Sequence, residues 1–514
     1  MMSKQPIILA ILDGWGEGAP NETNPIYVAE PKNFDYLRAN FPSGLLQASG
    51  ISVGLPWGEE GNSEVGHLNL GAGRIIYQYL PKIDMAIRDG SFFKNPTLKN
   101  AFEHAKKNNS SVNLIGLMGD GNVHSSFEHI KSLVEFAVKE NVSKINLHLF
   151  TDGRDSAPTS SVNLLASLPK EANLASISGR FYGMDREGYW DRTQKAYSVI
   201  AGEGPINADV EAYIKNSYAN KKTDEYIEPA RVKEGCEVKD NDAVIFFNFR
   251  EDRTKQIASV FADKNFQKFP AKKFNNLFVA MMTPYDKNIN AAVIFPNEPI
   301  SNCLGKILAD NGKNQLRIAE TQKYPHITYF FNGLEEKPFL NEYRVLIPSR
   351  PVARQDTHPE MMAAEIANRA VESIMEDAFD FVLINFANSD IIAHTGNYDA
   401  CVKAVSVIDE QIGKLIKTVL ETDATLIITS DHGNMEKVID EKTGNIETKH
   451  NASPVPIYLV GKKYMRPRTK EEILRSKKEN TGILADVAPT ILELMKLPQP
   501  KEMTGQSLFR FLVN

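Results

Sequence analysis

Short apolar runs recur along the chain, and each of them ends at polar residues that can carry chemistry. Three of these runs are PIILAIL (6–12), FVLINF (381–386) and ATLIIT (424–429). They lack the apolar–polar alternation of a strand with one face in water, so they are typical of parallel strands that are covered on both faces. Segments with helical periodicity lie at 359–375 and 398–420. Strands and helices that alternate in this way predict an α/β fold.

The middle of the chain repeats this pattern with different polar residues after the runs. Its apolar runs are SVNLIGLM (111–118), INLHLF (145–150), LASISG (174–179) and AVIFFNF (243–249). His124 follows the first of these runs and arginines follow the other three, whereas aspartates and histidines follow the runs nearer the two chain ends. We therefore predict two α/β domains: a discontinuous domain built from residues 1–77 and 298–514, and a second domain inserted at 78–297.

The length and charge of the chain narrow the function classes. A chain of 514 residues exceeds what one hydrophobic core organises, which agrees with two domains. The 59 basic and 65 acidic residues give a net charge of −6, which argues against broad binding to nucleic acid or to an anionic membrane. The run IILAIL near the N-terminus is too short for a signal-peptide core or a membrane span. Any anionic ligand must therefore be bound by a local basic cluster.

The three cysteines, Cys236, Cys303 and Cys401, lie far apart and form no C-x-x-C pair. A disulfide framework or a zinc ribbon is therefore not expected. This cysteine usage favours a reducing cytoplasm.

Carboxylates and imidazoles follow the apolar runs near the chain ends. Ligands of open α/β sheets bind beyond the carboxyl ends of the strands, so these side chains can converge on one site. Each has an ordinary alternative: Asp13-Gly14 suits a turn, and His450 suits a surface position. Together, oxygen and imidazole ligands without a thiolate suit Mn²⁺, with Zn²⁺, Co²⁺ or Mg²⁺ as alternatives, and two clusters suggest two ions. The candidate ligands are Asp13, Asp390, His394, Asp431, His432 and His450.

Ser63 lies in the stretch GNSEVGH (61–67) and is a candidate nucleophile. The stretch differs from the G-x-S-x-G elbow of serine hydrolases, because Gly66 comes one residue too late. A metal ion, rather than a neighbouring histidine, could lower the pKa of the hydroxyl. Alternatively, Asn62 or Ser63 is the N-cap of a helix. Both interpretations can hold, since a phosphate on this serine would meet the free N–H groups of the helix.

Basic residues and one carboxylate follow the apolar runs in the middle of the chain. An arginine taken alone is usually a surface group or an ion-pair partner. Several guanidinium groups at successive strand ends fit bidentate binding of phosphate and carboxylate. Asp155 could pair with Arg154 or exchange a proton with a substrate hydroxyl. The candidate substrate-binding residues are His124, Arg154, Asp155, Arg186, Arg192, Arg250, Arg253 and Lys323.

Several long motifs resemble the cofactor-independent, or 2,3-bisphosphoglycerate-independent, phosphoglycerate mutases of the alkaline-phosphatase superfamily. They occur in the family's order across almost the whole chain: ILDGWG, GNSEVGHLNLGAGRIIYQ, GDGNVHS, TDGRDSAP, GRFYGMDREGYWDR, FFNFREDRTKQ, RIAETQKYPHITYFFNG, NFANSDIIAH and TSDHGN. The resemblance implies an isomerase with an alkaline-phosphatase-like metal domain and an inserted transferase-like domain that binds the substrate.

The resemblance also implies roles for the candidate residues. One Mn²⁺ would be held by Asp390, His394 and His450. A second Mn²⁺ would be held by Asp13, Ser63, Asp431 and His432. Ser63 would accept the phosphoryl group, Lys323 would offset its charge, and Asp155 would move protons, while the remaining basic residues would hold the phosphoglycerate. The implied reaction interconverts 3-phosphoglycerate and 2-phosphoglycerate in glycolysis and gluconeogenesis, and we expect a monomer that binds this small molecule.

Two segments depart from the family's usual text. KHNASPVP surrounds His450, where a threonine-rich text is more usual, and Ser389 stands where proline is common. Two rival functions stay open at this point. One is a metal-dependent phosphatase or a phosphopentomutase of the same superfamily, and the other is a non-catalytic binding protein with the same fold. The arginine-bearing insert argues against the first, and a nucleophile among metal ligands argues against the second.

Overall fold

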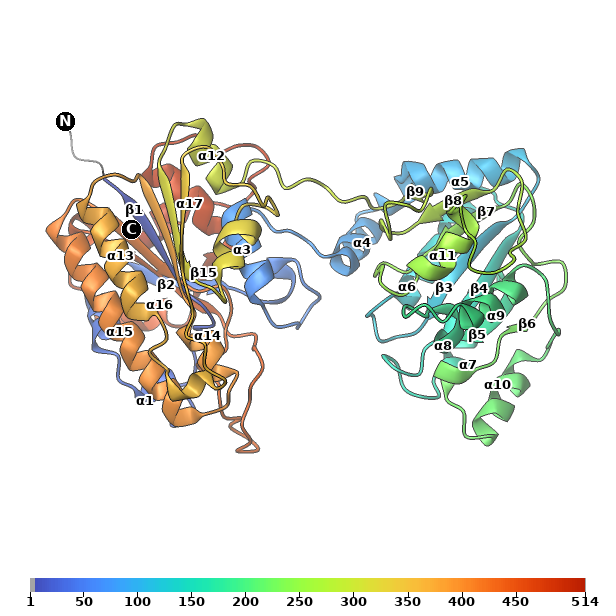
Figure 1. Cartoon of the computed structure of the whole chain (residues 1–514), viewed down its shortest axis with the longest axis horizontal. Coiled ribbons are helices and arrows are strands. Elements are labelled where there is room, and N and C mark those ends of the chain that lie inside the picture. The colour runs from blue at the N-terminus through green and yellow to red at the C-terminus, as the bar shows by residue number, and fades with distance from the viewer. Residues whose placement is uncertain (1–4, 514) are drawn as a thin grey trace. The chain divides into compact units, whose positions relative to one another are not determined.

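The computed structural model describes residues 5–513 and divides into two compact units (Figure 1). Unit 1 combines the N-terminal segment through Gln78 with the segment from Pro299 onward, and unit 2 is Tyr79–Glu298. Each unit is an α/β domain with its own sheet, which confirms the predicted fold class. Within residues 5–513, no helix has the length and apolar character needed to span a membrane.

The sheet of unit 1 has eight strands. The first five strands in its order pair in parallel, β14 is antiparallel to its two neighbours, and β15 pairs in parallel with β2. The strand order is β11 (Glu342–Ile347), β10 (Gln315–Glu320), β12 (Phe381–Phe386), β1 (Ile7–Leu12), β13 (Thr425–Thr429), β14 (Val455–Val460), β2 (Ser43–Gln47) and β15 (Asn480–Ile483). The three apolar runs predicted as parallel strands are β1, β12 and β13, and they lie side by side.

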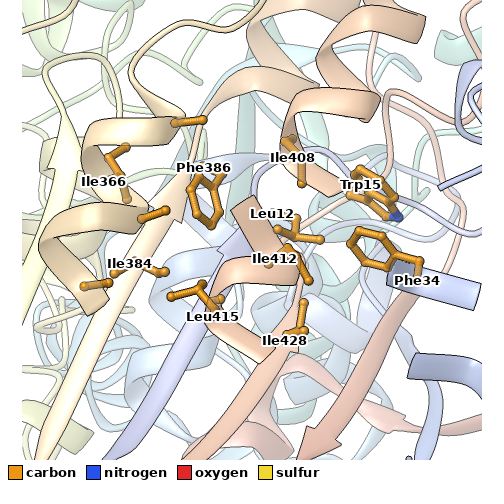
Figure 2. Packing of buried hydrophobic residues seen from close by; sticks show 14 of the residues in the cluster. Leu12, Trp15, Phe34, Ile366, Ile384, Phe386, Ile408, Ile412, Leu415 and Ile428 are labelled. Atoms are coloured by element: carbon orange, nitrogen blue, oxygen red, sulfur yellow. The ribbon is translucent and has the colours of Figure 1, made fainter. Parts of the chain in front are cut away.

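Helices cover both faces of this sheet. Strand β1 is apolar at every position, so its side chains need burial on either face. Ile8, Ala10 and Leu12 face one core, in which α13 (Ala363–Met375) and α15 (Tyr398–Glu421) bury residues such as Ile366 and Ile412. Figure 2 shows this core, with Trp15 stacked on Phe34 at a ring distance of 4.6 Å. The alternate residues Ile7, Leu9 and Ile11 face the opposite core, against α3 (Ser63–Ala72), α12 (Leu304–Asp310) and α17 (Val487–Leu494).

Shorter helices complete unit 1. They are α1 (Pro25–Val28), α2 (Lys32–Asn40), η1 (Gly50–Val53), η4 (His326–Phe330), η5 (Gln355–Thr357), α14 (Asn388–Ala393), η6 (Lys462–Tyr464), α16 (Lys470–Ser476), η7 (Leu484–Asp486) and α18 (Phe509–Val513). The helix expected from residue 359 begins at Ala363, because Met361 has a left-handed backbone with φ of 43°. A left-handed residue cannot continue a right-handed helix.

The sheet of unit 2 has seven strands, which pair in parallel except for β6 at one edge. The strand order is β6 (Ala230–Arg231), β5 (Asn173–Gly179), β4 (Ile145–Thr151), β3 (Val112–Met118), β7 (Ala243–Phe246), β8 (Phe278–Met281) and β9 (Ala292–Val293). The four apolar runs in the middle of the sequence are therefore the adjacent strands β5, β4, β3 and β7.

Both faces of this sheet are also covered. Val112 and Leu114 of β3 pack on the side of α5 (Pro96–Lys107) and α6 (Phe127–Lys139). Ile115 and Leu117 pack on the side of α9 and α11. The remaining helices are α4 (Tyr79–Arg88), η2 (Phe92–Lys94), α7 (Ser161–Leu165), α8 (Arg180–Gly183), α9 (Trp190–Ile200), α10 (Val210–Ala219), η3 (Asp224–Tyr226) and α11 (Lys255–Ala262).

Candidate active site

Four adjacent strands of unit 1 deliver polar side chains to one edge of the sheet. Asp13 follows β1, and Asp431 follows β13 with one residue between. Asp390 lies in α14, directly after β12, and Lys323 lies in the turn after β10. Because the carboxyl ends of parallel strands share one edge of a sheet, side chains from distant parts of the sequence meet there.

Ser63 is the first residue of α3 and joins this group. The side chain of Asn62 accepts a hydrogen bond from the Val65 N–H and caps the helix, so of the two candidate N-caps it is Asn62 that fills this role. Ser63 is 7% exposed, so its hydroxyl lies almost out of water. Its Oγ is 2.8 Å from Lys323 Nζ, 3.0 Å from His432 Nε2 and 3.1 Å from Asp13 Oδ1.

Lys323 lies at the centre of the buried carboxylates. Its ammonium is 2.5 Å from Asp13 Oδ1 and 2.7 Å from Asp390 Oδ2. Burial would lower the pKa of Lys323, but the carboxylates around it hold the pKa above its ordinary value. Burial would likewise raise the pKa of Asp13, but the ammonium of Lys323 and the hydrogen bond with His432 together outweigh this effect and hold the pKa well below its usual range. Lys323 thus contacts the carboxylates of unit 1, whereas the candidate arginines belong to unit 2.

A second group of ligand atoms lies around Asp390. The Nε2 atoms of His394 and His450 are each 3.1 Å from Asp390 Oδ1 and 3.0 Å from each other. Asp390 Oδ1 also accepts a hydrogen bond of 2.9 Å from Asn434 Nδ2, which fixes the carboxylate. His394 Nδ1 is 2.7 Å from the Thr448 carbonyl, an arrangement that orients Nε2 toward Asp390.

His67 and Asn385 also belong to this site, although the sequence did not single them out. His67 Nε2 is 3.0 Å from Asn385 Nδ2, which can only donate, so Nε2 accepts and Nδ1 carries the proton. That Nδ1 is 3.1 Å from Asp431 Oδ2 and 2.9 Å from the Ser63 carbonyl. Asn385 donates a second hydrogen bond of 2.8 Å to Asp13 Oδ2. Ligand atoms of His67, Asp13 and Asp431 lie within 4.8 Å of one another, so His67 is positioned to orient Asp431. The i, i+4 spacing from Ser63 on one helix was the available signal.

The side chains of this edge fit divalent cations. Ligand atoms of Asp390, His432 and His450 lie within 4.8 Å of one another. Three buried carboxylates surround Lys323, and although burial would lower the pKa of the fully buried His432, these carboxylates raise it to about 9. Such a concentration of negative charge out of water needs compensation by cations. Oxygen and imidazole donors without a thiolate suit Mn²⁺, Zn²⁺, Co²⁺ or Mg²⁺.

Several candidate residues of unit 2 follow three neighbouring strands of its sheet, β4, β3 and β7. His124 lies in the loop after β3, Arg154 and Asp155 lie in the turn after β4, and Arg250 follows β7. The backbone N–H groups of Phe249 and Arg250 lie 2.9 and 3.3 Å from the His124 carbonyl, so they tie the loop of β3 to the end of β7. These strands are neighbours in the sheet, and their ends therefore form one site within unit 2.

A cavity of about 200 Å³ at this edge is lined by arginines. The guanidinium groups that line it are those of Arg154, Arg180, Arg186, Arg192 and Arg253. Partial burial, followed by repulsion from the neighbouring arginines, lowers the pKa of Arg253. The lining also contains Asp185, Glu187 and Glu225, but the five arginines outnumber these three acids, and this excess of positive charge favours an anionic ligand.

Acidic neighbours hold several of these arginines in place. Arg192 pairs with Asp185 at 3.2 Å, and its guanidinium lies 4.0 Å from the ring centres of both Phe181 and Tyr189. Arg186 and Arg250 pair with Asp252 at 2.7 and 3.3 Å, respectively. The cation–π contacts and ion pairs orient the guanidinium groups before any ligand arrives.

Asp155 pairs with a residue that the sequence did not single out. Its Oδ2 is 2.5 Å from Nη1 of Arg180, whereas Arg154 has its ion pair with Glu225 at 3.6 Å. The alternative in which Asp155 pairs with its neighbour Arg154 is therefore wrong in this structure. Arg180 directly follows β5, just as the other candidate residues follow their strands, and this position was the available signal.

The fold and the site define a class of protein, and comparison with known proteins agrees. The chain matches the metalloenzyme superfamily over residues 5–499. It is 45% identical over 521 residues to the 2,3-bisphosphoglycerate-independent phosphoglycerate mutase of Clostridium novyi (strain NT), across 99% of this chain and 100% of that protein. It is 43% identical to the enzyme of the same name from Ectopseudomonas mendocina (strain ymp), across 98% of both chains.

A solved structure resembles the whole chain as well. The phosphoglycerate mutase of Leishmania mexicana, crystallised at low cobalt concentration, is 30% identical, with a TM-score of 0.52 across 98% of this chain and 97% of that one. The chain belongs to the family of 2,3-bisphosphoglycerate-independent phosphoglycerate mutases within the metalloenzyme superfamily. The family resemblance drawn from the sequence motifs is thereby confirmed.

Proposed function

We propose that this chain is an isomerase that interconverts 3-phosphoglycerate and 2-phosphoglycerate without 2,3-bisphosphoglycerate, through a phosphoserine at Ser63. The observation that carries the proposal is the position of the Ser63 hydroxyl. It is buried at the N-terminus of α3, within 3.1 Å of Lys323, His432 and Asp13. A serine without a role in phosphoryl transfer has no need of a buried ammonium and ligand-type side chains around its oxygen.

Two divalent cations would bind at the edge of the unit 1 sheet, and we propose Mn²⁺ for both, with Co²⁺, Zn²⁺ or Mg²⁺ as alternatives. The donor atoms that support this assignment are oxygens and imidazole nitrogens, and none of them is a sulfur. One cation would be held by Asp390, His394 and His450, and the other by Asp13, Ser63, Asp431 and His432. When bound, the cations would lower the pKa of the Ser63 hydroxyl and offset the charge of a phosphoryl group.

Ser63 would attack the phosphorus of the bound phosphoglycerate in line with the departing glycerate oxygen. Lys323, at 2.8 Å from Ser63 Oγ, would offset negative charge on the transferring oxygens. The free N–H groups and positive dipole end of α3 would stabilise the phosphate once it is on Ser63. The hydrogen bonds of His67 and Asn385 would keep Asp431 and Asp13 in place throughout.

The residues of unit 2 would bind the organic acid and move its protons. Asp155 would donate a proton to the departing glycerate oxygen and later accept one from the other hydroxyl, which then attacks the phosphoserine. Glycerate must stay bound between these two steps. The arginine-lined cavity supports this role, because guanidinium groups bind carboxylates through paired hydrogen bonds.

Several finer statements are also proposals. The substrate pair places the enzyme in glycolysis and gluconeogenesis. A location in the reducing cytoplasm is supported by the buried free thiols of Cys236, Cys303 and Cys401. The monomeric state expected from the sequence stays a prediction, which analytical ultracentrifugation would test.

The proposal is tested with Ser63→Ala in the full chain. We expect mutase turnover, assayed without 2,3-bisphosphoglycerate, to fall by about 10³-fold or more, because no other group can carry the phosphoryl intermediate. Phosphoserine, measured by mass spectrometry after a quench, should be lost in parallel. Ser373→Ala, a buried serine of α13, is the matched control and should retain both. Substantial mutase activity in Ser63→Ala would contradict the covalent route.

Metal removal gives an independent test. A strong chelator should abolish turnover, and titration of Mn²⁺ into the chelated protein should restore it. Chelation should also lower the melting temperature, because ligands that bind only the folded chain stabilise it. Full activity in protein verified to be free of metal would contradict the proposal. Turnover of phosphosugars in place of phosphoglycerate, or release of phosphate alone, would favour the rival phosphatase or phosphopentomutase.

A further inference from the structure

Arg180 is an almost fully buried guanidinium in unit 2 that bridges two carboxylates. Its side chain is 3% exposed, and Nη1 lies 2.6 Å from Asp152 Oδ1 and 2.5 Å from Asp155 Oδ2. A buried guanidinium with this geometry donates one N–H to each carboxylate and is a fixed point between them. Arg180 follows β5, whereas both carboxylates follow β4, so the bridge joins the ends of two neighbouring strands.

Asp152 holds the turn that carries Arg154 and Asp155. Its Oδ1 accepts the backbone N–H groups of these two residues at 3.2 and 3.1 Å. Its Oδ2 accepts the N–H and the hydroxyl of Ser156 at 3.0 and 2.9 Å. A carboxylate with this many donors is fixed in one orientation, and Arg180 supplies the compensating charge.

Ser156 extends this network to the loop that carries His124. Its Oγ accepts the N–H groups of Asp120 and Gly121 at 2.9 and 3.2 Å. Glycine is required here, because a Cβ on Gly121 would lie 2.4 Å from the Asp155 carbonyl oxygen. The ends of β3, β4 and β5 are thus connected through one hydrogen-bonded network with Arg180 at its charged end.

Arg180 also influences His124, which faces Asp155 at 3.8 Å and Asp252 at 3.4 Å. Burial is the main cause that lowers the pKa of His124 to about 4, and repulsion by Arg180 is the next. Arg250 acts in the same direction, whereas Asp252 and Asp155 oppose it. His124 is therefore neutral at physiological pH, in part because of Arg180.

We propose that Arg180 is a positioning residue of the mutase reaction, whose bridge between Asp152 and Asp155 fixes the Asp155 carboxylate for proton exchange with the substrate. This inference rests on the proposed function. It assigns Arg180 a role different from that of the other arginines of the cavity, because its charge is already engaged by two carboxylates. Loss of the bridge would leave Asp155 free to rotate away from the substrate hydroxyl.

Kinetics of Arg180→Met and Arg180→Lys in the full chain test the inference. In Arg180→Met we expect kcat to fall roughly 10²-fold with KM within about threefold of wild type, because positioning acts on the transition state. Arg180→Lys keeps the charge and should recover at least about tenfold of that loss. Arg231→Met, an ion-paired arginine on β6 whose partner is Glu237, is the matched control and should leave both constants unchanged. An increase in KM with kcat unchanged would make Arg180 a direct substrate ligand and overturn the inference.

A readout independent of turnover is the NMR titration of the His124 ring, assigned with His124→Gln. In Arg180→Met the ring should titrate about one pH unit or more higher than in wild type, whereas Arg180→Lys and Arg231→Met should keep the low value. An unchanged titration in Arg180→Met would overturn the inference. If Arg180→Met does not fold, Arg180→Lys decides: a lower kcat at constant KM supports positioning, and a higher KM at constant kcat overturns it. Failure of the proposed function is distinguishable, because wild type would then lack mutase turnover while the ring titration still responds to Arg180.

Discussion

At the scale of single residues, burial has opposite consequences that depend on the partners. Lys323 is buried among carboxylates, which keep its ammonium charged and beside Ser63 Oγ. His148 on β4 is buried among neutral groups, with Nδ1 2.8 Å from Ser176 Oγ and Nε2 3.3 Å from Asn113 Oδ1. Desolvation therefore lowers the pKa of His148 to about 3. Under the proposed function Lys323 takes part in phosphoryl transfer, whereas His148 should make unit 2 sensitive to acid.

His148 predicts a pH dependence of stability. Above pH 6.5 the ring is neutral in the folded and unfolded chain, so it adds no dependence. As the pH falls below 6.5, the unfolded chain binds a proton that the folded chain rejects, and stability decreases until the pH approaches 3. Between pH 7 and pH 5 this loss should be about 2 kcal/mol. Urea denaturation of the full chain, resolved for unit 2 by hydrogen exchange, measures it.

The comparison that isolates His148 uses His148→Gln. This variant should be less stable than wild type at pH 7, because the glutamine leaves buried polar groups imperfectly paired. Its stability should nevertheless fall less between pH 7 and pH 5, and the difference in slope is the contribution of His148. Equal slopes in wild type and His148→Gln would contradict the assignment.

At the scale of elements, the N-terminus of α3 positions Ser63, the proposed nucleophile. Asn62 accepts the Val65 N–H at 3.0 Å, and Ser63 is the next residue. Asn62→Ala should cost about 1 kcal/mol of stability, because one N–H of the first turn loses its acceptor. Fraying of this turn should also displace Ser63 and slow phosphoserine formation several-fold in rapid-quench measurements.

Asn95 of unit 2 offers the matched control. Its side chain caps α5 by accepting the N–H groups of Thr97 and Leu98, but no nucleophile follows it. Asn95→Ala should lose a similar amount of stability with an unchanged rate of phosphoserine formation. If both variants slow that step equally, the effect of Asn62 is global destabilisation instead of local positioning.

The apolar runs predicted the strands that build the two sites, because strands covered on both faces leave a continuous apolar signal. None of these apolar runs covers β10, although β10 lies next to β12 and leads to Lys323. Its sequence QLRIAE contains Arg317, which is fully buried between the rings of Phe331 and Phe381, 4.9 and 5.3 Å from their centres. A charged residue buried through tertiary contacts gives no local sign of burial.

The side chains of the site were predictable where chemistry and position coincide. Asp13, Asp390 and Asp431 were named because carboxylates and histidines at successive strand ends suit a divalent-metal site, and the structure brings the three carboxylates together around Lys323. Their roles as ligands stay predictions. Arg180 was not named, and the histidine after Ser63, His67, was set aside as an activator of the serine, because the importance of both depends on partners that only the folded sheet brings near.

At the scale of the whole molecule, the chain divides its chemistry between two sheets. Unit 1 concentrates carboxylates and imidazoles at the ends of β12, β1 and β13, beside Lys323 after β10, whereas unit 2 concentrates guanidinium groups at the ends of β5, β4 and β7, beside His124 after β3. The net charge of −6 gives no indication of either cluster. Under the proposed function, unit 1 makes and breaks the phosphoserine, and unit 2 retains the organic acid between the two half-reactions.

This division predicts that loss of a cavity arginine changes the fate of the phosphoenzyme. Arg253 lines the cavity of unit 2. Burial and then repulsion from Arg186, Arg180 and Arg154 lower its pKa. An anion bound beside it would relieve this repulsion. In Arg253→Ala, the loss of one charge-assisted contact, typically about 1.5–3 kcal/mol, should lower kcat/KM about tenfold to a hundredfold. Metal content should be unchanged.

Glycerate should also dissociate more often before the second transfer, and water should then take the phosphoryl group from Ser63. The measurement is inorganic phosphate released per 2-phosphoglycerate formed at saturating substrate, and this ratio should rise in Arg253→Ala but not in Arg231→Ala. A lower kcat/KM with an unchanged ratio would restrict Arg253 to the initial binding of substrate and would contradict retention of glycerate by this arginine.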